Sequence, residues 1–197
     1  MNIIDLIEKE VKDKINEYKN SSEDHYDFWN EHIKYVYIES QKLAEQYGAD
    51  KEIVKLGALL HDIALICKVG ERKDHHINGK ILAEEILNKY DYPKEKMDRV
   101  LSCVYNHRSS KNATNIEDLC VADGDIIAHF DNIPMLFNSA YNRNKINLNE
   151  VRNWLKECFE KDYNDLSDRT KENFKEQYKL ICNIAVSYTH LRAHETD

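Results

Sequence analysis

The chain has 197 residues and a formal net charge of −8, which argues against broad nucleic-acid binding because such binding relies on cations that neutralise phosphates. Five cysteines without a CxxC pair predict reduced thiols, and five Gly and two Pro leave few interruptions for helices. No basic region precedes an apolar run at the N-terminus and no stretch reaches the roughly 20 apolar residues that span a bilayer, so we expect a cytoplasmic protein without a membrane segment.

Apolar residues recur at intervals of three and four along most of the chain, and no segment shows the alternation typical of a strand. This pattern predicts an all-α fold. Gly48 suits a helix C-terminus, Asp50 is a candidate N-cap, and Pro93 suits a first helical turn. The expected helices, in chain order, span residues 3–18, 26–47, 51–66, 75–90, 93–107, 116–130, 151–159 and 174–185.

Two polar, metal-capable residues, His61 and Asp62, stand next to each other inside the apolar stretch LGALLHDIAL. Burying a carboxylate without a partner is costly, so such a group is normally paired or bound to a metal. Taken alone, His32 is more simply a satisfied core or surface histidine, and Asp123 an N-cap or loop carboxylate. Together, these residues give the order His, His-Asp, Asp on three separate predicted helices.

With these motifs the chain resembles the HD-domain superfamily of metal-dependent phosphohydrolases. The resemblance rests on the segments EHIKYVYIESQKLAEQYGAD, LGALLHDIAL, DHHINGKILAEEIL, VYNHRS and VADGDII, and it covers roughly residues 26–131. It implies an HD-domain helical bundle with an N-terminal helix and a C-terminal helical extension. The expected parts are an amphipathic helix at residues 1–20, the HD-domain core at 21–135 and helices packed on the core at 136–185.

The resemblance also implies a set of metal ligands. His32, His61, Asp62 and Asp123 match the four residues that hold one divalent ion in the family. Imidazole and carboxylate donors suit Mn²⁺, Fe²⁺, Co²⁺, Ni²⁺ or Zn²⁺, and carboxylates with water also permit Mg²⁺. One ion is expected and a second stays open, because some members of the family hold two.

Further histidines match the positions that serve a second ion in such members. They are His107 and either His75 or His76, and the spacing does not decide between the last two. The resemblance implies that they bind the scissile phosphate, protonate the leaving oxygen or complete a second metal site. Asp62 is expected to orient the water beside the metal or to bridge two ions.

The chain departs from the family pattern directly after the HD pair. Asp-Ile-Ala-Leu at residues 62–65 replaces the frequent Asp-Ile-Gly-Lys, so a phosphate-contacting lysine is missing from its usual place. Lys68, Arg72, Lys73 or Arg108 could supply positive charge, although solvated surface positions are the simpler interpretation.

The expected function is hydrolysis of a phosphomonoester or phosphodiester by metal-activated water, with a small phosphorylated substrate and a nucleotide as its class. The alternative is a catalytically inactive metal-binding HD domain that senses a nucleotide or holds a partner, which the missing lysine favours. A helical interaction protein with incidental histidines is the third interpretation, and the His61-Asp62 pair is what it explains worst. Oligomeric state and exact substrate are not indicated.

The end of the chain differs in character. The segment VSYTHLRAHET at residues 186–196 resembles the translation of a transposon adapter used in DNA sequencing. We expect residues 186–197 to be a non-native tail, and the alternative is a frayed natural terminus; both interpretations exclude His190 and His194 from the site.

Overall fold

The computed structural model describes residues 2–23, 26–143 and 147–185, and the tail expected at 186–197 lies outside these ranges. Within them every regular element is helical, which confirms the all-α prediction. None of these helices combines the length and apolarity that crossing a bilayer requires. The α-helices are α1 (Ile3–Ser21), α2 (Lys34–Tyr47), α3 (Lys51–Leu60), α4 (Ile63–Ile66), α5 (His75–Asn88), α6 (Lys94–Asn106), α7 (Ile116–Asp131), α8 (Ile133–Asn138), α9 (Leu148–Asp165) and α10 (Asp168–Ala185).

Short turns complete the set of elements. A π-helical turn, η1 (Trp29–Ile33), leads into α2, and a second one, η4 (Ser139–Arg143), follows α8. Two 3₁₀ turns, η2 (Arg72–Asp74) and η3 (Ser110–Asn112), precede α5 and α7. The sequence pattern did not predict α8 or η4, and it placed the last two helices several residues shorter than they are.

Helix ends follow the predicted signals. Gly48 ends α2 with a left-handed φ of +74°, which a glycine adopts without steric cost. The Asp50 side chain accepts hydrogen bonds from the backbone N–H groups of Glu52 and Ile53 at the start of α3. Pro93 stands at the N-cap of α6, one residue before the first turn in which it was expected.

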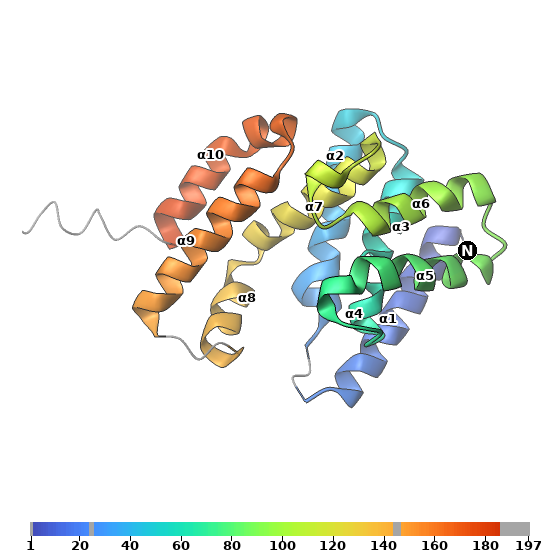
Figure 1. Ribbon diagram of the computed structural model, residues 1–197, viewed down its shortest axis with the longest axis horizontal. Helices are drawn as coiled ribbons and strands as arrows, with labels where there is room; N and C mark the ends of the chain where they lie inside the picture. Colours follow the sequence, from blue (N-terminus) through green and yellow to red (C-terminus); the bar gives the residue numbers. More distant parts are fainter. Residues whose placement is uncertain (1, 24–25, 144–146, 186–197) are drawn as a thin grey trace, which may run out of the picture.

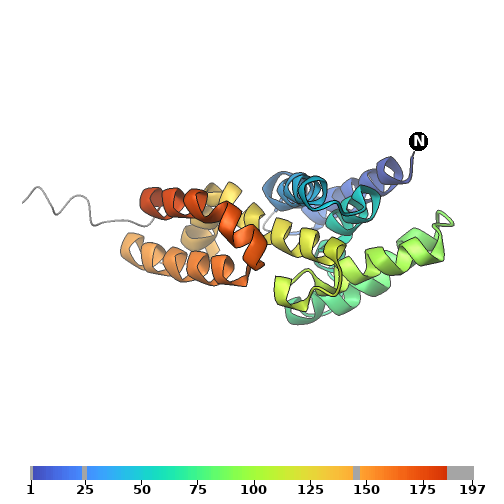
Figure 2. The same cartoon turned by 90° about the horizontal axis from the view of Figure 1, so that it is seen from above.

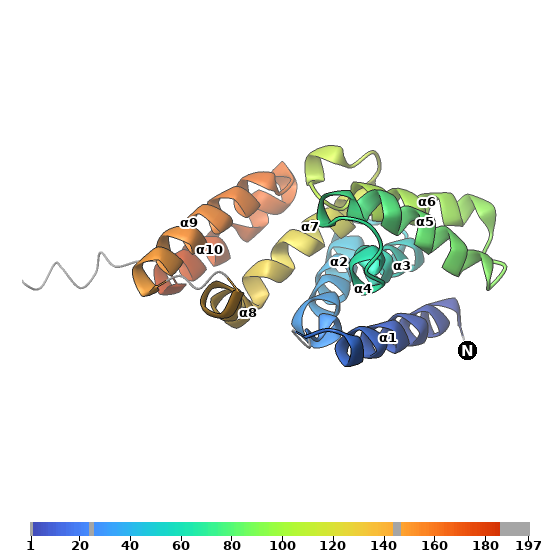
Figure 3. The same ribbon diagram turned by 60° about the horizontal axis from the view of Figure 1, so that its bottom comes forward.

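Helices α2 and α7 form the most extensive helix pair and cross the middle of the bundle (Figure 1; Figure 3). Gly124 of α7 permits this close contact. A Cβ added at Gly124 would lie 2.2 Å from Oγ and 2.8 Å from the backbone nitrogen of Ser40 on α2. The glycine inside α7 is therefore required by packing between helices and does not break the helix.

The helix expected over residues 51–66 is interrupted at the HD pair. α3 ends at Leu60, Asp62 has φ −104° and ψ 17°, and α4 begins at Ile63. In an uninterrupted helix, adjacent side chains diverge by about 100°. The break gives His61 and Asp62 the freedom to point toward one centre.

A helical hairpin of α9 and α10 packs on the end of α7. Phe130 of α7 lies 5.1 Å from the ring of Phe159 on α9 and 5.2 Å from that of Phe174 on α10, measured between ring centroids. Figure 2 shows this hairpin at one end of the molecule, with α1 toward the other end. The hairpin thus contacts the same helix that carries Asp123 and Asp125.

Candidate metal centre

Four histidines and two aspartates from separate elements converge in the bundle. Their side chains are nearly buried, with exposed fractions between 0% and 15%. The break after α3 positions His61 and Asp62, and the start of α5 positions His75. The set consists of His32 of η1, His61 and Asp62 between α3 and α4, His75 of α5, His107 after α6 and Asp125 of α7.

One half of the cluster surrounds the Nε2 atom of His32. This atom lies 3.1 Å from His61 Nε2 and 3.1 Å from Asp125 Oδ1. Asp62 Oδ2 lies 3.6 Å from the Nε2 atoms of both His32 and His61. Ligands at about 2.0–2.2 Å from one ion lie roughly 3–3.5 Å from each other, so this half has the spacing of a metal site.

The other half of the cluster contains His75 and His107. Their Nε2 atoms are 2.9 Å apart, and they lie 3.3 Å and 3.8 Å, respectively, from Asp62 Oδ1. The two oxygens of the Asp62 carboxylate thus face two different pairs of histidines.

Backbone carbonyls fix how three of these histidines present their rings. The Nδ1 atoms of His61, His75 and His107 lie 2.6–2.8 Å from the carbonyl oxygen three residues earlier in the chain. A carbonyl oxygen only accepts, so Nδ1 carries the hydrogen and Nε2 of the neutral ring carries the lone pair. Two lone pairs facing each other at 2.9 Å repel unless a cation binds them, which fits a metal.

The charge states suit cation binding. Burial, reinforced by His61, lowers the pKa of His107 to about 4, so this ring is neutral near pH 7. Burial alone would raise the pKa of Asp62, but the neighbouring histidines outweigh it and hold this pKa below its usual value. Burial alone would also raise the pKa of Asp125, but the hydrogen bond and charge of His32 hold this pKa well below the ordinary range.

The structure does not bring Asp123 into the cluster, where the resemblance places it. Asp123 is fully buried on another face of α7, where Ser110, Ser167 and Thr170 donate to its carboxylate. Residues two apart on a helix point about 200° apart, so Asp123 and Asp125 cannot face the same centre. Asp125 takes the position near His32.

His75, and not His76, faces the cluster. The ring of His76 packs 5.3 Å from that of Tyr105, and the nearby Arg108 adds to burial in lowering its pKa. The basic candidates are engaged elsewhere: Arg108 donates to the carbonyl of Lys73, and Lys73 pairs with Glu71 at 2.8 Å.

Lys68 contacts the N-terminal helix. Its Nζ donates to Ser21 and lies 4.8 Å from the ring centroid of Tyr18. The Lys68 ammonium group therefore binds to groups of α1.

Two residues near the centre were missed from the sequence, Asp125 and His129. One ligand atom each of His32, Asp125 and His129 lies within 4.8 Å of the other two. Asp125 and His129 are four residues apart and share one face of α7, and this spacing was the available signal. Burial opposes protonation of His129, but the hydrogen bond to Asp162 and nearby carboxylates raise its pKa to about 9.

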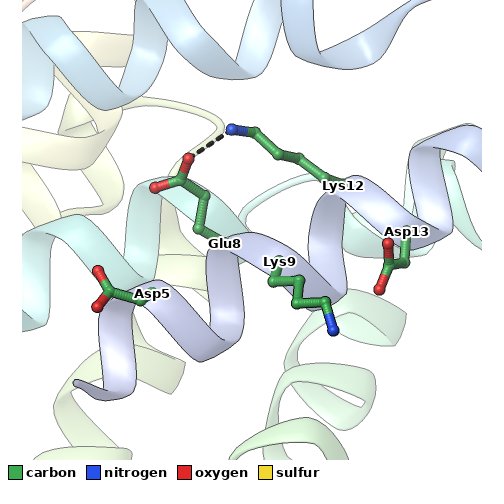
Figure 4. A pocket seen from close by; sticks show the side chains of 5 residues that line it. All are labelled: Asp5, Glu8, Lys9, Lys12 and Asp13. Carbon is green, nitrogen blue, oxygen red and sulfur yellow. Dashed lines mark hydrogen bonds and ion pairs between the residues drawn. The ribbon is translucent and has the colours of Figure 1, made fainter. Parts of the chain in front are cut away.

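A separate depression of about 360 Å³ lies on the surface of α1 (Figure 4). Charged residues of this one helix line it, and Lys12 pairs with Glu8 across it at 2.5 Å. It contains no member of the histidine–aspartate cluster. The lining residues are Asp5, Glu8, Lys9, Lys12 and Asp13.

Comparison with known proteins identifies a family for the central part of the chain. The HD domain model matches residues 30–129. A segment of 98 residues, half of this chain, is 34% identical to ribonuclease Y of Treponema denticola, and 70 residues, or 36% of it, are 31% identical to an uncharacterised protein of Clostridium beijerinckii. These matches span 18% and 45% of the two relatives, respectively, which is less than half of each.

Two crystal structures share the fold over nearly the whole chain. An HD-superfamily hydrolase from Bacillus thuringiensis has a TM-score of 0.71 and 18% identity, covering 98% of this chain and 97% of its own. A protein from Listeria innocua has a TM-score of 0.65 and 20% identity, covering 99% and 100%. At such identities the likeness shows the fold.

Proposed function

The chain belongs to the HD-domain family, and we propose that it hydrolyses a phosphomonoester or phosphodiester with two divalent ions held by the histidine–aspartate cluster. His32, His61 and Asp125 would hold the first ion, and His75 and His107 the second. Asp62 would contact both. A nucleotide is the proposed substrate class, as the resemblance to the family implies.

The position of Asp62 carries this proposal. Its Oδ2 faces His32 and His61 at 3.6 Å, while its Oδ1 faces His75 at 3.3 Å. A carboxylate placed in this way serves as a bridge between two ions, which in two-metal enzymes stand about 3.5–4 Å apart. Histidines on both sides of one carboxylate favour two ions over one.

When bound, such ions activate a water near neutral pH and offset the negative charge of phosphate oxygens. The protein side chains hold and orient the reacting groups. Asp62 is ionised at neutral pH and accepts a hydrogen bond from the attacking water. His107 serves as a ligand and not as a proton donor, because at a pKa of about 4 only about one ring in a thousand is protonated at pH 7.

A substrate screen tests the proposal. Nucleoside mono-, di- and triphosphates, p-nitrophenyl phosphate and bis-p-nitrophenyl phosphate are each incubated with protein and Mn²⁺, Co²⁺ or Ni²⁺. We expect at least one compound to be hydrolysed, and Asp62→Ala to lower the rate by at least about 100-fold, the size typical of lost transition-state charge stabilisation.

A matched pair of variants on α7 serves as the control. Asp125→Asn is expected to lose activity, whereas Asp123→Asn, an identical change two residues away, is expected to retain it at temperatures where both are folded. Equal turnover by wild type and Asp62→Ala would indicate a contaminating phosphatase. Nucleotide binding without turnover by the wild type would favour the inactive sensor instead.

A further inference from the structure

We propose that His129 is an additional ligand of the first metal and that Asp162, on α9, is the positioning residue that aims it. This inference rests on the proposed function, because it assumes that an ion binds beside His32. Because the family match ends at residue 129, Asp162 extends the site beyond the matched part of the chain.

The position of His129 supports a ligand role. His129 lies one helical turn after Asp125, so both side chains lie on the same face of α7. One ligand atom of each of His32, Asp125 and His129 lies within 4.8 Å of the other two. The imidazole of His129 is one-third exposed, which places it toward the solvent side of the cluster.

Asp162 determines which ring nitrogen of His129 is available. The Nδ1–H of His129 donates to Asp162 Oδ2 at 2.9 Å, so a metal would bind through Nε2 and displace the proton that this nitrogen carries near pH 7. His61, His75 and His107 present their rings in the same way, with backbone carbonyls in place of the carboxylate. A hydrogen-bond acceptor on the second ring nitrogen is the usual support of a metal-binding histidine.

The hairpin that carries Asp162 is held firmly against α7. Phe159, three residues before Asp162 on α9, stacks on Phe130 next to His129. At the turn between α9 and α10, the backbone and hydroxyl of Ser167 both donate to Asp123. These contacts on the two sides of Asp162 fix the distance from α9 to α7, which gives the hairpin a role in the metal centre.

Metal affinity, measured independently of catalysis, tests this inference. Co²⁺ is titrated into metal-free protein, and binding is followed by calorimetry and by visible absorption of the ion. We expect Asp162→Ala to weaken binding of one of the two ions by about 10–100-fold, the usual effect of removing such support. Asp162→Asn is expected to recover most of the affinity, because its amide oxygen accepts the same hydrogen bond.

Asp165→Ala is the matched control on the same helix. Asp165 accepts a hydrogen bond from Ser109 and pairs with Lys111, so its removal deletes a comparable carboxylate contact to the core without involving His129. We expect its Co²⁺ affinity to equal that of the wild type. Equal affinities for Asp162→Ala, Asp165→Ala and the wild type would overturn the inference.

A double-mutant cycle separates positioning from a general effect on packing. If Asp162 acts through His129, His129→Ala binds Co²⁺ at least as weakly as Asp162→Ala does, and the double variant binds it as weakly as His129→Ala. Additive losses would overturn the inference. Full affinity in His129→Ala would also overturn it, and this variant tests the inference even if Asp162→Ala does not fold. A wild type that binds no Co²⁺ would instead refute the proposed function.

Discussion

Replacing Asp123 with alanine is expected to destabilise the fold while leaving both metal positions, whereas replacing Asp125 is expected to remove one of them. Asp123 is fully buried, and it accepts hydrogen bonds from the Ser167 backbone at 2.9 Å and from the hydroxyls of Ser110, Ser167 and Thr170. Asp125 lies 3.1 Å from His32 within the cluster.

The magnitude follows from the donors that Asp123→Ala leaves behind. Ser110 and Thr170 are buried, with exposed fractions of 8% and 2%, so water replaces the lost acceptor poorly. Each buried donor left unsatisfied costs about 1–3 kcal/mol, which gives about 2–6 kcal/mol in total. At about 2–4 °C per kcal/mol, we expect a fall in Tm of roughly 4–24 °C.

The assay combines urea unfolding in EDTA with Co²⁺ titration at 10 °C. Asp123→Ala should lose stability and still bind two ions, whereas Asp125→Ala should bind one ion fewer. If Asp123→Ala were as stable as wild type and lacked an ion, the assignment of these two carboxylates would be refuted.

Three further changes test other features. Gly124→Ala places a Cβ 2.8 Å from the Ser40 backbone nitrogen, so urea unfolding should show a loss of about 3 kcal/mol; an unchanged midpoint would contradict the α2–α7 packing. Burial and Glu39 raise the pKa of Asp131 to about 6. The folded state favours the protonated carboxyl, and this contribution to the free energy of unfolding is lost as pH rises through about 6. Asp131→Asn should therefore raise Tm by about 2–4 °C at pH 7.5 and by less at pH 4.5; equal gains would exclude this cause. Mn²⁺ at 100 times its Kd should add about 2.7 kcal/mol to the free energy of unfolding, and an unchanged melting curve would count against metal binding.

Local sequence signals predicted those parts of the fold that depend on neighbouring residues. Apolar spacing located the helices, and Gly48 and Asp50 marked a helix end and a helix start where the structure has them. The interruption between α3 and α4 was missed, because the apolar residues on both sides of the HD pair continue the same helical period.

The candidate site was predictable up to the choice between two aspartates. The motif VADGDII contains Asp123 and Asp125, and the sequence alone does not show which one faces His32. That choice depends on the rotation of α7 about its axis, which packing against α2 and the hairpin determines. The contact of His129 with Asp162 joins residues 33 positions apart and follows from the same tertiary packing.

Anomalous diffraction from crystals grown with Mn²⁺ tests the two-metal centre most directly. We predict two peaks about 3.5–4 Å apart on either side of Asp62, one within bonding distance of Asp125 and the other within bonding distance of His107. A single peak, peaks that do not contact Asp62, or an ion bound at Asp123 would contradict this account.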